Sequence, residues 1–177
     1  MPRTLGTVSV TLKFLDQMVN PPPTAMAGET LLLSPEYQRG DRWTMRQKRE
    51  FVGSYLEGVP IPPVYAQRYH DKTHVPSGKR EVDMPDEVLD GNQRLTALLG
   101  WFHGEFPAEL ADGREIWYRD TDEVDRRAVP MITIHYVDLA LVDRLTFYLK
   151  LNRGGTPHTD EEIAMVRAMR DALMAPQ

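Results

Sequence analysis

The chain has 177 residues, and 26 acidic against 21 basic residues give it a formal net charge of −5. This length suits one domain with a sizeable core, and the acidic balance excludes DNA coating by bulk charge, so nucleic-acid contact needs a local basic patch. The absence of cysteine excludes disulfides, thiol catalysis and cysteine-ligated zinc. No stretch reads as a membrane span or a secretory signal, and we therefore expect a cytoplasmic protein without membrane partners.

Two strands and one helix are expected in the first third. Residues 7–15 alternate between apolar and polar positions, which predicts a half-buried strand. Thr44 and Gln47 form a capping-box pattern, so a helix is expected to begin at Thr44 and to end at Gly58. Residues 60–65 contain three prolines and predict an edge strand, because proline cannot donate to a central ladder.

The middle of the chain is expected to be a long charged loop followed by a strand and a helix. Asp83, Asp86 and Glu87 form a carboxylate run that we expect to be solvated rather than bound to a metal. A short strand at residues 87–89 leads into a helix whose apolar residues recur at helical spacing.

The last third predicts a strand at residues 131–137, with His135 in a structural role, and a helix at residues 139–151. A final helix is expected to begin at Thr159, with Glu162 completing a second capping box. This order of strands and helices predicts an α+β fold, in one domain over residues 1–177.

Residues 90–94, Asp-Gly-Asn-Gln-Arg, join the predicted strand to the predicted helix. Asn92, Gln93 and Arg94 would therefore lie at a helix N-terminus, where free N–H groups and the macrodipole attract anions. A carboxylate, amides and a guanidinium gathered there are typical of a phosphate site. The alternative is a capped surface helix without a ligand.

Two other clusters pair an amide side chain with arginine, which suits bidentate phosphate contacts. They are Gln38 and Arg39, close to Arg42 and Trp43, and Asn152 and Arg153, which precede two glycines. A candidate DNA-binding run consists of Arg42, Trp43 and Arg46 with their basic neighbours. Its alternative is a solvated helix face balanced by Asp41 and Glu50. The five histidines lack the spacing of metal ligands, so zinc is not expected.

With these segments in order, the chain resembles the GmrSD-type family, whose members carry an Asp-Gly-Gln-Gln-Arg motif in a ParB/sulfiredoxin-like fold. The matching segments are residues 35–39, 57–62, 89–98 and 151–157. The resemblance implies a small mixed sheet with flanking helices, nucleotide binding with Mg²⁺, in several members NTP hydrolysis, and a role in DNA restriction or phage defence.

By this resemblance, Asp90, Gln93 and Arg94 would be the catalytic residues of an NTPase. Arg94 would neutralise phosphate, Gln93 would orient a water, and Asp90 would hold Mg²⁺ or act as a base. Gly91 and Asn92 would join them in binding the nucleotide. Gln38 and Arg39 would face the same pocket, and Asn152 and Arg153 would close its far side.

Two departures from the family pattern shape the expected function. The third residue of the motif is Asn92 instead of glutamine, a side chain one methylene shorter, which would weaken hydrolysis while binding survives if that amide contacts the nucleotide. Family members of the restriction type carry a further His-Asn-His nuclease domain, and we expect none after residue 177. The chain would then be a sensor that works with DNA and with a nuclease subunit or a full-length relative. The first alternative is a catalytically inactive DNA-binding or protein-interaction module, an inhibitor or partner of a nuclease. The second is a stand-alone ParB-like nuclease, against which the sequence offers no evident two-metal carboxylate cluster and no His-based nuclease motif.

Overall fold

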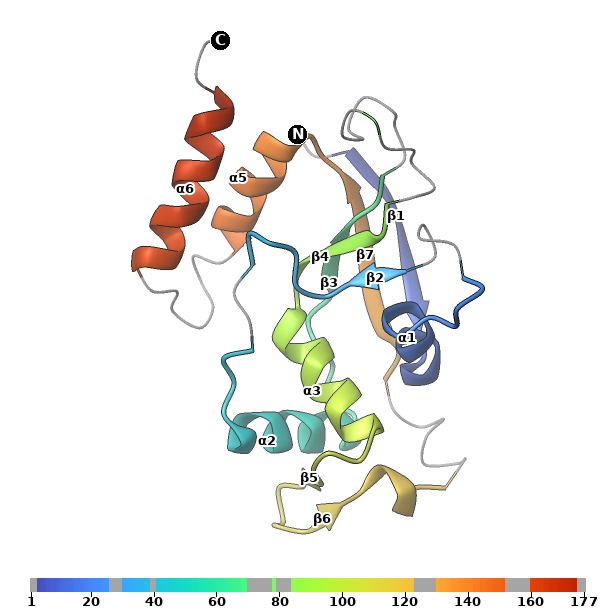
Figure 1. Ribbon diagram of the computed structural model, residues 1–177. Helices are drawn as coiled ribbons and strands as arrows, with labels where there is room; N and C mark the ends of the chain where they lie inside the picture. Colours follow the sequence, from blue (N-terminus) through green and yellow to red (C-terminus); the bar gives the residue numbers. More distant parts are fainter. Residues whose placement is uncertain are drawn as a thin grey trace.

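A mixed five-stranded sheet organises the chain (Figure 1). The computed structural model describes residues 3–25, 30–38, 41–69, 78, 84–122, 130–151 and 160–174. The strand order is β1 (Arg3–Val10), β7 (Ile132–Asp138), β3 (Val64–Gln67), β4 (Asp86–Asp90) and β2 (Leu31–Leu32). β1 with β7 and β3 with β4 are antiparallel, whereas β7 with β3 and β2 with β4 are parallel. The predicted α+β class and mixed sheet are confirmed.

Helices cover the two faces of the sheet and create two cores. α1 (Leu12–Val19), α2 (Met45–Leu56) and α3 (Asn92–Phe102) bury their apolar residues in the larger core. α5 (Leu141–Leu151) and α6 (Asp160–Met174) close the smaller one. β4 contributes to both cores, because its neighbouring residues Val88 and Leu89 face opposite sides of the sheet.

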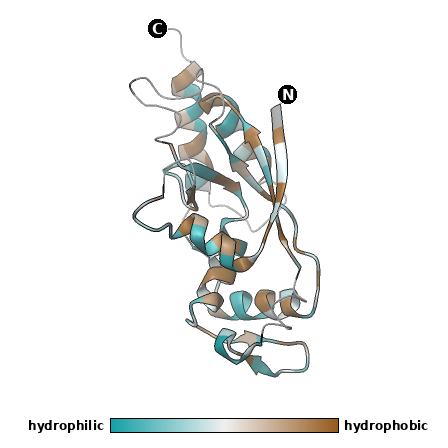
Figure 2. Cartoon of the chain, turned by 90° about the vertical axis from the view of Figure 1, so that its right-hand side faces the viewer, coloured by the Kyte–Doolittle hydropathy of each residue, from teal (hydrophilic) through white to brown (hydrophobic). Residues whose placement is uncertain are grey.

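The α5–α6 pair and a small hairpin lie at opposite ends of the molecule (Figure 1). The hairpin pairs β5 (Ala108–Glu109) with β6 (Glu115–Ile116), and a 3₁₀ turn, η3 (Tyr118–Asp120), follows it. Brown and teal segments alternate along the helices in Figure 2, as expected for helices that bury one side only. Within the described residues, no helix combines the length and apolar character needed to cross a membrane.

The predicted start of α2 is confirmed in detail. The Thr44 hydroxyl accepts a hydrogen bond from the Gln47 N–H at 3.3 Å, and the Gln47 side-chain oxygen accepts from the Thr44 N–H at 2.9 Å. This reciprocal capping box satisfies two of the helix's orphan donors. Gly58 follows the helix with a φ of +82°, a value that glycine adopts without strain.

The predicted strand at residues 7–15 is wrong in its second half. β1 ends at Val10, and Thr11 caps a helix by accepting a hydrogen bond from the Phe14 N–H. The alternation continued into α1 by coincidence: Leu12, Leu15 and Met18 are the buried positions, at helical spacing, and Phe14 is exposed.

The predicted edge strand at residues 60–65 is also wrong. β3 begins at Val64, after the last proline, and lies between β7 and β4. Since residues 64–67 contain no proline, every backbone N–H of this strand can donate to a ladder, and the strand is tolerated inside the sheet.

Candidate functional site

The candidate site is built on the turn from β4 into α3, at residues 90–94. Gly91 caps the helix with a φ of +103°, in the left-handed region. A Cβ at this position would lie 2.7 Å from Cγ2 of Val64, so glycine is required both by the backbone and by the space. Because the N-cap residue is glycine, it has no side chain of its own to cap the first turn of α3. The turn therefore combines a helix N-terminus with the polar side chains of the motif.

Asp90 and Arg94 form an ion pair across the turn, with Nη2 of Arg94 2.5 Å from Oδ2 of Asp90. Nη1 of Arg94 donates to the carbonyl oxygen of Pro62 at 2.8 Å. The guanidinium is mostly buried, whereas about a third of the Asp90 side chain, 32%, is exposed. Arg94 thus connects the motif turn to the segment that leads into β3, and it holds the Asp90 carboxylate at the surface.

Gln93 holds another part of the chain. Its side-chain oxygen accepts hydrogen bonds from the backbone N–H groups of Arg42 and Trp43, at 2.7 and 2.9 Å. This amide therefore fixes the segment that enters α2. In this arrangement Gln93 positions the backbone, a role that the motif alone did not suggest.

Asn92 is buried and joins neighbouring segments. Its Nδ2 donates to the Ser34 hydroxyl at 3.0 Å, and its side-chain oxygen accepts from the Thr96 hydroxyl at 3.1 Å. The side chain thus bridges the segment after β2 and the first turns of α3. The contacts of this amide are structural, so its length bears on packing.

The structure brings Gln38 to the same strand: its Nε2 donates to the carbonyl oxygen of Val88, two residues before Asp90. Arg39, Asn152 and Arg153 lie outside the described residues. Of the predicted nucleotide-binding residues, Gln38, Gly91 and Asn92 are therefore placed beside the predicted catalytic residues Asp90, Gln93 and Arg94.

The predicted DNA-binding residues are engaged within the chain. Arg42 pairs with Glu162 of α6 at 2.5 Å, and Arg46 pairs with Glu50 at 2.7 Å. The Trp43 ring packs edge-on against Phe51, with centroids 5.0 Å apart. These ion pairs agree with a charge-balanced surface, and a contact of these residues with DNA stays a prediction.

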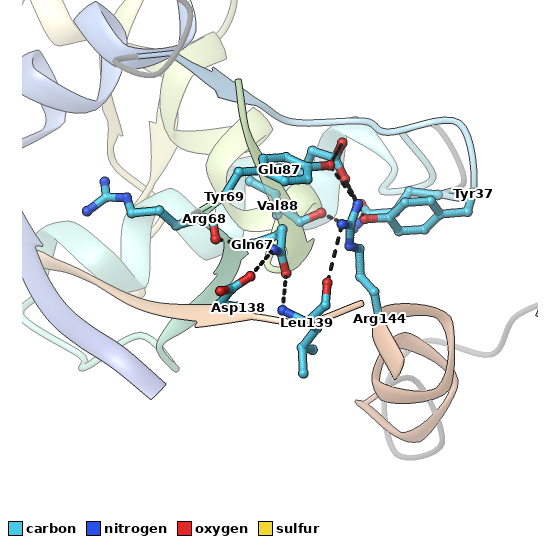
Figure 3. Close-up of polar contacts among 10 residues, drawn as sticks. Tyr37, Gln67, Arg68, Tyr69, Glu87, Val88, Asp138, Leu139 and Arg144 are labelled. Atoms are coloured by element: carbon cyan, nitrogen blue, oxygen red, sulfur yellow. Dashed lines mark hydrogen bonds and ion pairs between the residues drawn. The ribbon is translucent and has the colours of Figure 1, made fainter. Parts of the chain in front are cut away.

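Sequence reasoning missed a buried polar cluster around Glu87, which Figure 3 shows. One carboxylate oxygen accepts from the Tyr37 hydroxyl at 3.0 Å and from Nη1 of Arg144 at 2.8 Å. The other accepts from the Tyr69 hydroxyl at 2.7 Å. We call these four residues the Glu87 cluster. It joins β4 to the segment before α2, to the end of β3 and to α5.

The expectation of a solvated carboxylate run is wrong for Asp86 and Glu87; Asp83 lies outside the described residues. Both carboxylates belong to β4 and are paired with arginine, Glu87 with Arg144 and Asp86 with Arg68. A signal was present: Arg144 lies among apolar residues at helical spacing, and a charge on an apolar face indicates a buried partner.

Burial, and then the negative charge of Glu87, raises the pKa of Tyr37 far above its usual range. Burial works against the charge of Arg144, but Glu87 and the tyrosines outweigh it and keep the pKa of Arg144 above its usual value. The tyrosines therefore stay neutral donors and the arginine stays charged over the physiological pH range.

A second polar group extends the cluster along the sheet (Figure 3). Gln67 donates to Asp138 at 3.2 Å and accepts from the Leu139 N–H at 3.0 Å. Nη2 of Arg144 donates weakly to the Leu139 carbonyl oxygen at 3.4 Å. These hydrogen bonds fix the position of the start of α5 relative to β3 and β7.

The described residues contain no group of three or more metal-ligating side chains. Asp90 alone, partly exposed at the turn, fits a Mg²⁺ ion that arrives with phosphate groups, because such ions use one or two carboxylates and keep several waters. The donor set does not fit a metal held by the protein alone.

These features define an α+β domain with a polar turn between strand and helix as its candidate site. The family model described as "GmrSD restriction endonuclease, N-terminal domain" matches residues 25–133, and the chain belongs to this family. The match includes the motif turn and ends before Asn152 and Arg153. The domain is thus a restriction-related module. Neither the curated proteins nor the solved structures contain a match.

Replacing Arg144 by methionine is expected to destabilise the fold by about 3–5 kcal/mol, because it leaves a buried carboxylate without its charged partner. The urea midpoint, followed by circular dichroism, measures this change. The double variant Glu87→Gln with Arg144→Met should recover part of the loss. Arg114→Met, at an exposed pair with Asp112, is the control. A single Arg144 variant with the wild-type midpoint would contradict the role of the cluster.

Asp86 is expected to make stability depend on pH. Burial raises the pKa of this carboxyl to about 6 from 3.8, although Arg68 partly opposes the shift. Because the folded-state pKa is the higher one, this contribution to stability is complete below pH 4 and is lost as the pH rises through 6. Relative to Asp86→Asn, the wild type should lose up to about 3 kcal/mol of unfolding free energy between pH 4 and pH 7.5. A difference that stays constant with pH in urea titrations would refute this.

Proposed function

We propose that this domain binds a nucleoside triphosphate at the turn formed by residues 90–94 and acts as the regulatory module of a restriction system. Family membership supports the restriction context. The observation that carries the proposal is the placement of Asp90, Gln93 and Arg94 at the start of α3, beside a glycine N-cap that holds the turn. Helix N-termini favour phosphate through their N–H groups and macrodipole.

The Asp90–Arg94 pair has the right charges to receive a metal–phosphate pair. When the nucleotide binds, Asp90 would release Arg94 and offer its carboxylate to the Mg²⁺ that accompanies the phosphates. Arg94 would then turn from the carboxylate to a phosphate oxygen, which its planar guanidinium binds in the same geometry. The exposed position of Asp90 and the short reach between the two side chains support this exchange.

A second candidate function is a binding switch without turnover. It is favoured by the contacts of Gln93, whose side-chain oxygen already holds two backbone N–H groups. A glutamine that orients a water for hydrolysis needs its polar atoms directed at that water. Nucleotide binding without phosphate release would therefore agree with the geometry of Gln93. Measuring binding and phosphate release on the same protein sample distinguishes the two functions.

A contact with DNA and the cooperation with a nuclease subunit or a full-length relative belong to the same proposal. Arg42 and Trp43 precede α2 and Arg46 lies in its first turn, and Arg42 is half exposed. These side chains would have to exchange their internal partners for phosphates. Binding by such a patch would weaken steeply with added salt.

Arg94→Ala is expected to abolish saturable binding of nucleoside triphosphates with Mg²⁺, because it removes the cation that would neutralise the phosphates. Isothermal titration with each nucleotide measures binding, and a phosphate-release assay on the same samples measures turnover. Arg94→Lys, which keeps the charge but not the planar fork, should weaken binding at least tenfold.

Arg114→Ala is the matched control, because it removes an arginine from an exposed turn outside the motif. Thermal melts of each variant show whether the fold is retained, since Arg94 also bonds to Pro62. Unchanged binding in folded Arg94→Ala would overturn the assignment of the site. The absence of binding for every nucleotide in the wild type would overturn the proposed function.

A further inference from the structure

One segment of the chain contacts both the motif turn and the C-terminal helices. We call it the strap and define it by the described residues 33–38 and 41–44, between β2 and α2. Figure 1 shows the chain passing beside the α5–α6 pair before it reaches α2. The strap thus lies where it can transmit a change at the turn to α6.

On the side of the turn, the strap is held by side-chain contacts from β4 and α3. Gln93 accepts hydrogen bonds from the N–H groups of Arg42 and Trp43. Gln38 donates to β4, and Ser34 accepts from Asn92. Of the motif residues, Gln93 therefore holds the strap through its backbone and Asn92 through the Ser34 side chain.

On the other side, the strap contacts α5 and α6. Tyr37 packs edge-on against Tyr148 of α5, with ring centroids 5.8 Å apart. Nη2 of Arg42 lies 2.5 Å from Oε1 of Glu162 in α6. The Arg42 side chain is 53% exposed and that of Glu162 is 17% exposed, so the arginine can turn from this pair toward an anion in solvent.

The placement of Arg42 has a chemical consequence. Its backbone N–H is bonded to Gln93, the residue that precedes Arg94, while its guanidinium neutralises a carboxylate of α6. A phosphate bound at the turn within reach of this guanidinium would compete with Glu162 for it. Such competition is reciprocal: an anion that displaces Glu162 loosens α6, and removal of Glu162 strengthens anion binding.

We propose that Gln93, Arg42 and Glu162 form a latch that couples the motif turn to the docking of α6. In this latch the Glu162 carboxylate pairs with the Arg42 guanidinium, the group that a bound phosphate would otherwise bind. This inference rests on the proposed nucleotide site for its ligand, whereas the coupling itself belongs to the strap and is testable without a ligand. Loss of the latch should loosen the docking of α6, because few apolar residues anchor this helix: Val166 is buried in the smaller core, whereas Met165 and Leu173 are exposed.

Hydrogen exchange of the backbone amides of residues 163–170 tests the latch in the whole chain without nucleotide. Glu162→Gln and Gln93→Ala should each speed exchange about two- to fivefold, the range expected for losing one partly exposed ion pair. The double variant should exchange no faster than either single variant. Glu161→Gln, which changes the neighbouring exposed carboxylate, should exchange as the wild type does. An unchanged α6 in folded Gln93→Ala, or effects that multiply in the double variant, would overturn the latch.

Titration with each nucleoside triphosphate and Mg²⁺ then tests the competition. We expect a bound nucleotide to speed exchange in α6 of the wild type and Glu162→Gln to bind it about two- to fivefold more tightly. A nucleotide that binds by calorimetry and leaves α6 unchanged would contradict the competition. If no nucleotide binds the wild type, the proposed function fails, and the exchange rates of the variants still decide whether the latch exists.

Discussion

The carboxylate of Glu87, whose side chain is 12% exposed, is the constraint on which the arrangement of the site depends. An ionised carboxylate inside a protein costs several kcal/mol unless it is paired and hydrogen-bonded. Tyr37, Tyr69 and Arg144 all donate to it, and they come from the strap, the end of β3 and α5. The requirement to satisfy Glu87 therefore holds three separate segments around β4, three residues before Asp90.

The side chains of the motif turn that hold the fold together are the same ones that would bind the proposed ligand. Arg94 bonds to Pro62, and Gln93 bonds to the N–H groups of Arg42 and Trp43. A ligand that recruits either side chain has to release a contact with another segment. Such competition is how a small domain converts binding into a change of shape, because the free energy of the ligand's contacts shifts a balance between two sets of contacts.

Much of this fold could be predicted from local patterns. The capping box at Thr44, the alternation of β7 and the strand–glycine–helix turn at Gly91 depend on neighbouring residues, and all three are confirmed. The pairing of Glu87 with Arg144, 57 residues apart, depends on tertiary contacts that no local pattern contains. The same reason explains the misplaced β3: its prolines lie just before the strand, and its neighbours are β4 and β7. For the site, the motif located the turn, but only the fold showed that Gln93 holds the strap.

The most direct test of the nucleotide site follows the backbone amides of the turn by ¹⁵N-resolved NMR during titration with a nucleoside triphosphate and Mg²⁺. We expect the amide signals of Asn92, Gln93 and Arg94 to shift and saturate together, because phosphate at a helix N-terminus bonds to these N–H groups. Saturating shifts confined to another surface, with the signals of these three amides unchanged, would contradict a nucleotide site at the start of α3.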